Sequence, residues 1–286
     1  MILVADAGSS KTHWSLIDNK EIISTRTQGI NPVLMNKNII YEILQTDSLL
    51  NPKKQNINTI YFYGAGCSDN SLQENIKTAL RKYFPNANIN VFSDLYGAAR
   101  SLFHNTSGIA CILGTGAGCC RYDGKQITQR SPSLGFILGD EGSGAFFGKE
   151  LLKRFFYGRL PKNLEDKLLQ KHKIEKKEVL SRIHQQKAPG KYLAEFCYFL
   201  DENKNDSYIK KMIEDGLKEF IETHVMDLQP KPNEKIKVTG SVGWFFKDIL
   251  YTTVKQYGLQ IDKIIQSPIN GLVDYHQKEI HGNNNQ

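Results

Sequence analysis

Two short glycine-rich turns are the first residues in this chain whose types and spacing could bind a ligand. Asp6-Ala7-Gly8-Ser9-Ser10-Lys11-Thr12 follows the apolar run Ile2–Ala5, and Gly114-Thr115-Gly116-Ala117-Gly118 follows the apolar run Gly108–Ile112. Such turns place few side chains in the way of a ligand and can direct successive N–H groups at an anion. An ordinary hairpin would explain either turn alone. Because strand, turn and strand recur in both halves, the sequence predicts a duplicated architecture whose two turns bind phosphates at one site.

Two aspartates follow predicted strands and could take part in phosphoryl chemistry. Asp6 ends the first strand, where a carboxylate can hold Mg²⁺, often through water, together with substrate phosphates. Asp94 lies between a strand at 89–92 and a helix at about 95–103, where the helix N-terminus favours its ionised form. It could then accept a proton from a substrate hydroxyl. The plainer alternatives are a turn-forming Asp6 and an Asp94 that merely caps its helix.

Two further glycine-rich stretches lie at predicted helix starts. Gly139-Asp140-Glu141-Gly142-Ser143-Gly144 combines two carboxylates with glycines, and acceptors of this kind suit the hydroxyl groups of a sugar. A capping turn would explain Asp140 but not the density of glycine. Gly240-Ser241-Val242-Gly243 joins a strand to a helix and could form a wall for a nucleotide, although many such turns have no ligand.

The elements that must position these residues alternate between strands and helices, which predicts an α/β fold with parallel pairing after the opening antiparallel strands. In the first half we expect the helix 37–45 to be capped by Asn36, and the helix 71–83 to be opened by a capping box at Ser71. In the second half we expect irregular structure at 131–138, helices from 164 to 228 with a break at 188–190, a tight turn at 240–243 and one helix over 244–257.

Composition restricts the class of protein. The 286 residues suffice for two domains, and the net charge of +7 comes from lysines scattered over predicted helices, so we expect no nucleic-acid partner. No apolar run reaches the length of a membrane span and no cleavable leader is apparent, which predicts a cytoplasmic protein without a membrane partner. The five cysteines include no CxxC pair and are interpreted as reduced packing residues.

Taken in order, these motifs resemble those of the sugar kinases in the actin, hexokinase and Hsp70 superfamily, and more narrowly those of the BadF/BadG/BcrA/BcrD-type ATPase family with its N-acetylglucosamine kinases. The resemblance spans nearly the whole chain. It implies two ribonuclease H-like, actin-like ATPase domains with an interdomain cleft. The N-terminal domain would cover 1–108, with the last helix at 269–281 packing back on it, and the C-terminal domain with a helical insertion would cover 109–268.

The resemblance also implies an enzyme, an ATP-dependent phosphotransferase that phosphorylates an amino sugar, N-acetylglucosamine at its 6-hydroxyl above all. Asp94 would be the catalytic base and Asp6 would position Mg²⁺. The implied ATP-binding residues are Gly8, Ser9, Ser10, Lys11, Thr12, Gly114, Thr115, Gly116, Gly240, Ser241 and Gly243. The implied sugar-binding residues are Asn31, Asp94, Thr115, Asp140 and Glu141. We also allow for a homodimer.

This sequence departs from the resembled pattern near the implied sugar site. N-acetylglucosamine kinases usually carry Asn where Gly118 lies, and a Gly-Trp-Gly stretch where Ser133-Leu134-Gly135 lies. Kinase activity is therefore a firmer expectation than the identity of the sugar. Two alternatives stay open: an ATPase that activates a dehydratase or reductase through an iron–sulfur cluster, and a non-catalytic nucleotide-binding sensor or assembly protein.

Overall fold

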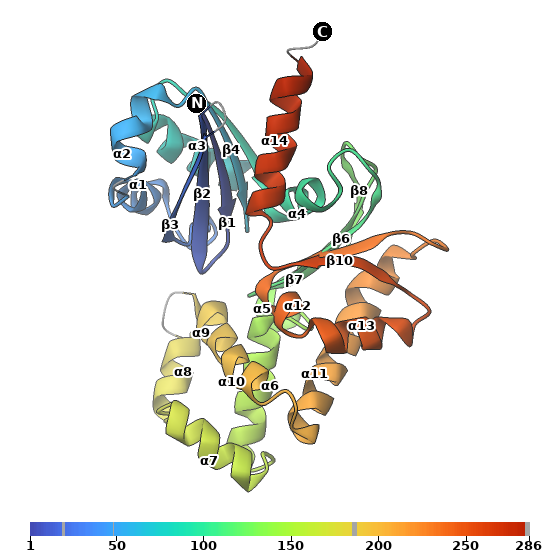
Figure 1. Ribbon diagram of the computed structural model, residues 1–286. Helices are drawn as coiled ribbons and strands as arrows, with labels where there is room; N and C mark the ends of the chain where they lie inside the picture. The colour runs from blue at the N-terminus through green and yellow to red at the C-terminus, as the bar shows by residue number, and fades with distance from the viewer. Residues whose placement is uncertain (19–20, 48, 185–187, 284–286) are drawn as a thin grey trace. The chain divides into compact units, whose positions relative to one another are not determined.

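The chain divides into two compact units, which are described separately (Figure 1). The structure is a computed structural model that describes residues 1–18, 21–47, 49–184 and 188–283, with side chains described up to residue 279. The first unit comprises Met1–Ser107, Tyr122–Ile127 and Ser267–Gln286, and the second comprises Gly108–Arg121 and Thr128–Gln266. The expected domains, 1–108 and 109–268, put 122–127 in the second half, whereas here it groups with the first unit.

The first unit is built on a mixed five-stranded sheet in the order β3-β2-β1-β4-β5. Its strands are β1 (Ile2–Ala7), β2 (Lys11–Asp18), β3 (Glu21–Gln28), β4 (Thr59–Gly64) and β5 (Asn88–Ser93). β2 pairs antiparallel with both β1 and β3, whereas β4 pairs parallel with both β1 and β5. The carboxyl ends of β1, β4 and β5 therefore lie at one edge of the sheet, just before the residues predicted to do chemistry.

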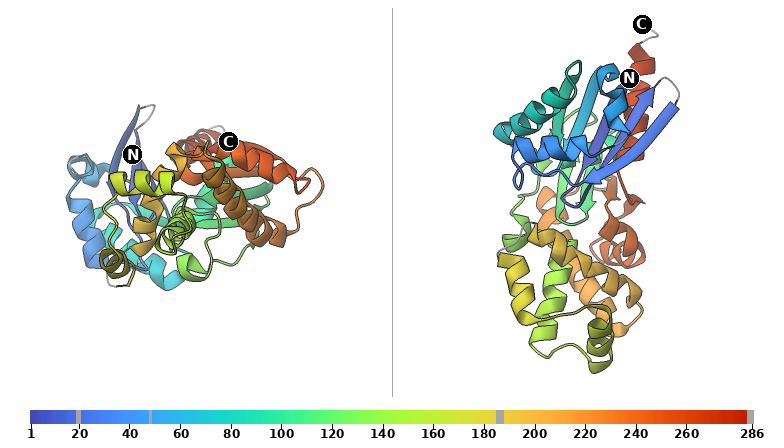
Figure 2. Two further views of the ribbon diagram at one scale, coloured as in Figure 1. Left: turned by 90° about the horizontal axis from the view of Figure 1, so that it is seen from below. Right: turned by 90° about the vertical axis from the view of Figure 1, so that its left-hand side faces the viewer.

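Helices cover both faces of this sheet. α1 (Lys37–Gln45), α2 (Leu50–Lys53) and α3 (Asn70–Tyr83) lie on one face, and α4 (Asp94–Phe103) and α14 (Ile269–Asn283) lie on the other (Figures 1 and 2). The alternation of side chains along β1 creates both layers, because Leu3 and Ala5 join the core under α1 and α3 whereas Val4 joins the core under α14. The end of the chain thus stabilises the unit that contains its beginning.

The second unit repeats the plan with a mixed sheet in the order β10-β9-β6-β7-β8. The strands are β6 (Gly108–Leu113), β7 (Ala117–Tyr122), β8 (Ile127–Arg130), β9 (Ile236–Thr239) and β10 (Ile261–Ile265). A single large core joins β6, β7, β9 and β10 to α6 (Gly144–Phe156), α11 (Ser207–Phe220), α12 (Ser241–Phe245) and α13 (Lys247–Lys255). The insertion consists of α7 (Lys162–Lys171), α8 (Lys176–His184), α9 (Pro189–Glu195) and α10 (Cys197–Glu202), of which α9 and α10 pack on α6 (Figure 1).

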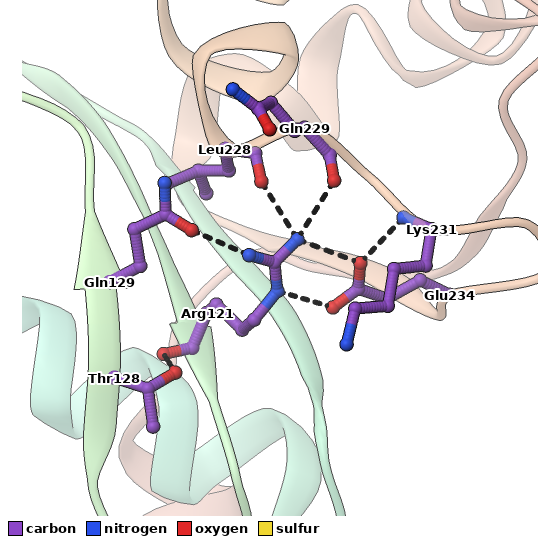
Figure 3. A network of polar contacts seen from close by, with 7 residues as sticks. All are labelled: Arg121, Thr128, Gln129, Leu228, Gln229, Lys231 and Glu234. Carbon is purple, nitrogen blue, oxygen red and sulfur yellow. Dashed lines mark hydrogen bonds and ion pairs between the residues drawn. The ribbon is translucent and has the colours of Figure 1, made fainter.

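A polar network anchors the segment before β9 to strand β7 (Figure 3). The Arg121 guanidinium forms a two-pronged ion pair with Glu234, at 2.8 and 3.0 Å, and donates to the carbonyl oxygens of Leu228 and Gln229. Gln129 on β8 accepts a further hydrogen bond from the same side chain. The partners of Arg121 in this network lie on the second sheet or on the segment that leads into it. We therefore assign the network a structural role.

Several expected elements were wrong in detail. Asp69, not Ser71, caps α3, because its carboxylate accepts from the N–H groups of Ser71 and Leu72. Residues 131–138 were expected to be irregular but include the short helix α5 (Gly135–Leu138), and the connection between α1 and β4 contains α2 and the 3-10 helix η1 (Lys54–Asn56). The expected break between helices is present at Ala188, which has a left-handed backbone, but Pro189 and Gly190 already belong to the next helix, α9, because the fixed φ and missing N–H of proline suit a first turn.

The structure confirms the α/β class and the helix 37–45 capped by Asn36. The five cysteines are free and buried. Across residues 1–18, 21–47, 49–184 and 188–283, no helix combines the length and the apolar character needed to cross a bilayer.

Candidate active site

The first glycine turn is shorter than the sequence indicates. Asp6 and Ala7 belong to β1, while Lys11 and Thr12 belong to β2, so only Gly8-Ser9-Ser10 forms the turn. The Gly8 N–H donates to the Lys11 carbonyl oxygen at 3.0 Å and closes it. Gly8, Ser9 and Ser10 are half-buried and Lys11 is exposed, which suits these four residues to contact a phosphate.

Asn31 lies beside this turn, although 22 residues separate it from Ser9 in sequence. Its Nδ2 donates to Ser9 Oγ at 3.1 Å, and its Oδ1 accepts from the Val33 N–H at 3.0 Å. Gly29 makes this approach possible, because a Cβ there would lie 2.5 Å from the Ser9 carbonyl carbon. Thr12 is fully buried and its hydroxyl accepts from the Ile30 N–H at 3.1 Å, so it supports the Asn31 turn rather than facing a ligand.

Asp94 is the first residue of α4 but does not cap it. Ser93 is the N-cap, and its Oγ accepts from the Tyr96 N–H at 3.3 Å. Asp94 Oδ1 accepts from the Leu95 N–H at 2.8 Å, which together with the helix N-terminus favours the ionised carboxylate. The plainer explanation of Asp94, that it is the helix cap, is therefore wrong.

Asp6 and Asp94 interact electrostatically within the first unit. Burial, and then the charge of Asp94, raise the pKa of Asp6 to about 7, while Ser267 and Lys11 act in the opposite direction. Two neighbouring carboxylates repel each other when both are ionised, and a bound cation would reduce this repulsion. Among the residues that the structure describes, no group of three or more His, Cys, Asp or Glu side chains could hold a metal. Mg²⁺ bound by one carboxylate, water and substrate phosphates does not need such a group, so the residues fit that ion.

The second glycine turn is fixed by the start of α6. The N–H groups of Gly144 and Ala145 donate to the carbonyl oxygens of Gly114 and Thr115, at 2.8 and 3.1 Å. In a trans peptide the N–H points opposite to the C=O, and the described backbone has no cis peptide bonds. The N–H groups of Thr115 and Gly116 are therefore directed away from α6, which is the arrangement that an anion-binding turn needs.

The acid motif and the second turn form one assembly. Asp140 Oδ1 accepts from the Ala117 N–H at 3.1 Å, and a Cβ at Gly116 would lie 3.1 Å from both Asp140 carboxylate oxygens. Burial raises the pKa of Asp140. Asp140 also has a left-handed backbone, with a φ of 60°, and such strain in a non-glycine residue is concentrated at functional sites. Glu141, the next residue, is one-fifth exposed.

The Gly240 stretch is not the expected tight turn, because α12 already begins at Ser241 and a second helix, α13, begins at Lys247. Gly240 has a φ of 124° and packs so closely on the second turn that a Cβ would collide with the Leu113 carbonyl oxygen. Ser241 is exposed, whereas Gly243 is buried against Val238 and Leu113. Gly243 therefore serves packing, and Ser241 can face a ligand.

Sequence reasoning missed residues that support this chemistry from a distance. The hydroxyl oxygen of Ser267, a residue just before α14, lies 3.5 Å from Asp6 Oδ2 and 3.3 Å from His13 Nδ1. In the second unit, His224 and Ser131 lie behind Glu141. A lone serine after a strand or a lone histidine within a helical turn has no local sequence signature, and only the tertiary structure reveals these partners.

The chain is similar to solved structures of sugar kinases. It shares 32% identity and a TM-score of 0.90 with the "Putative N-acetylglucosamine Kinase" from Porphyromonas gingivalis, over 96% of this chain and 98% of that one. The chain belongs to this family of sugar kinases. It is accordingly an enzyme, an ATP-dependent phosphotransferase.

More distant structures share the fold alone. The protein of the same name from Chromobacterium violaceum is 14% identical, with a TM-score of 0.75 over 96% of this chain and 98% of that one. A hexokinase from Schistosoma mansoni, solved with glucose, is 13% identical, with a TM-score of 0.54 over 96% and 84% of the two chains. No protein-family model and no curated protein sequence matches the chain.

Proposed function

We propose that this sugar kinase transfers the γ-phosphoryl group of ATP to the 6-hydroxyl of an amino sugar, N-acetylglucosamine first among them. One observation carries the proposal: Asp94 stands ionisable at the start of α4 although Ser93 already caps that helix, and it interacts electrostatically with Asp6. The similarity to the P. gingivalis protein supports the choice of sugar.

In the proposed reaction Asp94 accepts the proton of the sugar hydroxyl as its oxygen attacks the γ-phosphorus. A new O–P bond forms, the bond from the γ-phosphorus to the bridging oxygen breaks, and ADP leaves with that electron pair. Because such transition states are loose, positioning and charge stabilisation contribute more than a strong base would. Mg²⁺ positioned by Asp6 would neutralise phosphate charge when bound.

The two glycine turns supply the phosphate contacts in this proposal. Ser9 and Ser10 offer N–H groups and hydroxyls, Lys11 offers an ammonium, and Gly8 places no side chain in the way of the phosphate. The N–H groups of Thr115 and Gly116 point away from α6. Ser241, on the exposed side of α12, would contact the nucleoside. Gly240 lets α12 and the second turn approach each other closely, whereas Gly114 leaves open space beside the turn, where a phosphate could lie.

The sugar contacts come from Asn31, Thr115, Asp140 and Glu141. Asn31 already has its amide oriented by Ser9 and Val33, and Asp140 is held by the Ala117 N–H. Amide and carboxylate oxygens at fixed positions discriminate strongly between sugars that do and do not present matching hydroxyls. The narrower placement in the BadF/BadG/BcrA/BcrD-type family is part of this proposal and rests on the order of the motifs.

A coupled assay of ADP release over a panel of amino sugars and hexoses tests the function. We expect Mg²⁺-dependent turnover with N-acetylglucosamine and slow ATP hydrolysis without sugar. Equally fast ATP hydrolysis with and without every sugar would reject the kinase and favour the activator ATPase, whose anaerobic preparation should show iron–sulfur absorbance. Tight nucleotide binding with no turnover at all would favour the sensor. Cytoplasmic location and a homodimer stay predictions.

A further inference from the structure

We infer that His224 and Ser131 are positioning residues that orient Glu141 as an acceptor for the sugar. The inference rests on the proposed function and extends it to residues on other elements of the second unit. His224 lies in the π-helical turn η2 (Ile221–Val225), which continues α11. Ser131 follows β8, and Glu141 lies in the loop before α6. π-Helical turns are rare and are often found at functional sites.

A chain of hydrogen bonds joins the three side chains. Glu141 Oε2 lies 3.0 Å from His224 Nε2, and His224 Nδ1 lies 3.1 Å from Ser131 Oγ. The chain ends on the backbone of β7, where the Cys119 N–H donates to Ser131 Oγ at 3.1 Å. Every link is thus tied to an element of the second core, and both ring nitrogens of His224 are engaged.

The number of available protons restricts which atoms donate in this series of hydrogen bonds. Ser131 Oγ has one hydrogen, and it lies close to both His224 Nδ1 and the Cys119 carbonyl oxygen, at 3.1 and 3.3 Å. If that hydrogen goes to Nδ1, neutral His224 carries its proton on Nε2. If it goes to the carbonyl, Nδ1 must donate to Ser131 Oγ, and Nε2 then carries a proton only when the ring is charged. An ionised Glu141 can only accept, so in the arrangement that we infer Nε2 donates to it.

Burial gives this bond its importance. The His224 side chain is 3% exposed, whereas that of Glu141 is 20% exposed. The carboxylate is therefore held on its inner side by a buried donor and can be reached by a ligand on its outer side. Hydrogen bonds to charged groups in such surroundings are roughly twice as strong as neutral ones. The donor also offsets the repulsion between Glu141 and its neighbour Asp140.

The loop that carries Glu141 packs closely on α11. This packing can hold the Glu141 carboxylate at a fixed distance from His224. Gly142 has a φ of 71°, and a Cβ there would lie 2.7 Å from Phe220 Cβ and 3.0 Å from the Gly216 carbonyl oxygen. The Phe220 ring lies 5.5 Å from the His224 ring. The close approach at Gly142 therefore holds Glu141 within hydrogen-bond distance of His224.

Four variants measured for both substrates test the inference. His224→Leu removes both hydrogen bonds of the ring, and we expect the KM for N-acetylglucosamine to rise by about ten- to hundredfold. The KM for ATP should stay within about twofold, because the ATP contacts lie elsewhere. His224→Gln keeps an amide that can donate to Glu141 and should restore most of the affinity. Ser131→Ala should give an intermediate loss.

Glu234→Gln is the matched control. It removes the ion pair between Glu234 and Arg121 in the same unit, and Glu234 contacts none of the proposed sugar-binding residues. It should lower thermal stability without changing either KM. The inference is overturned if His224→Leu keeps the wild-type sugar KM, or if the KM values for sugar and for ATP rise by the same factor in His224→Leu.

A second measurement covers the case that His224→Leu fails to fold. In wild-type protein labelled with ¹⁵N-histidine, saturation with N-acetylglucosamine should shift the ring resonances of His224, because the sugar changes the charge that Glu141 presents to Nε2. Unchanged resonances under saturating sugar would overturn the inference. Failure of the wild type to phosphorylate any amino sugar would instead reject the proposed function, and active wild type with an unchanged His224→Leu would reject only the role of His224.

Discussion

The two units carry the same strand–turn–strand motif and fix it in opposite ways. In the first unit the turn Gly8–Ser10 is held by a side chain, Asn31, and the acid Asp6 belongs to the strand itself. In the second unit the turn is held by backbone N–H groups of α6, and the acids Asp140 and Glu141 come from a separate loop. In the proposed reaction the first unit would supply the acids Asp6 and Asp94 together with the sugar contact Asn31, and the second would supply the sugar contacts Asp140 and Glu141.

The largest effect should follow from removing the base of the first unit. Asp94→Asn keeps the size of the side chain and leaves the Ser93 cap in place, but it cannot accept the sugar proton. We expect kcat to fall by about 10²–10⁴-fold, the usual contribution of a positioned general base. Isothermal titration should show sugar and ATP still bound. Near-normal turnover by the purified variant would remove Asp94 from the base role.

A pair of glycine substitutions separates packing from ligand contact in the second unit. Gly240→Ala forces a side chain onto the Leu113 carbonyl oxygen at a φ of 124°, and should lower the free energy of unfolding by about 3 kcal/mol. Gly114→Ala meets no atom within 4 Å and should change that free energy by less than about 0.5 kcal/mol. Urea denaturation measures both. If Gly114→Ala nevertheless raises the KM for ATP by about tenfold, a phosphate of ATP contacts this turn. An unchanged KM for ATP would argue against that contact.

Acid should destabilise the first unit through His276. Burial, and then Arg100, lower the pKa of His276 to about 3. In the unfolded chain His276 takes up a proton near pH 6.5, whereas in the folded unit it stays neutral until about pH 3. The free energy of unfolding therefore decreases as the pH falls from about 6.5 toward 3. Between pH 6.5 and 4.5 the wild type should lose about 2 kcal/mol more than His276→Gln. Thermal unfolding of both proteins across this range measures the difference, and parallel pH profiles would contradict it.

The smallest effect concerns the side chain that holds the first turn. Asn31→Ala removes the hydrogen bonds to Ser9 and Val33, and we expect the sugar KM to rise by about fivefold to tenfold. Asn36→Ala is the matched control, because it removes the cap of α1 in the same unit and costs about 1 kcal/mol of stability. Equal sugar KM values in the two variants would show that Asn31 acts through stability alone.

Much of the fold could be predicted from the sequence, because it depends on local patterns. The apolar run Ile2–Ala5 predicted β1, and the helix 37–45 with its Asn36 cap was confirmed. The errors arose where two local signals compete. Asp69 and Ser71 are both good caps, and Asp69 wins because its carboxylate accepts from two N–H groups.

The candidate site was predictable only in part, because its support comes from distant segments. The acids and glycines could be found since their motifs are contiguous. Thr12 and Gly243 lie in the same motifs, yet the structure buries both, and sequence gives no measure of that. His224 reaches Glu141 across 83 residues, and Ser267 reaches Asp6 across 261. Such contacts exist only after the sheets and helices have packed.

The central claim is that this sugar kinase forms a phosphate ester on the 6-hydroxyl of an amino sugar. The most direct test is ³¹P NMR with proton coupling of a reaction that contains the wild-type protein, ATP, Mg²⁺ and N-acetylglucosamine. The account predicts ADP together with a new phosphomonoester signal that is split by the two protons on carbon 6, and neither signal with Asp94→Asn. Inorganic phosphate and ADP without a sugar ester, or an ester coupled to the proton of carbon 1, would contradict it.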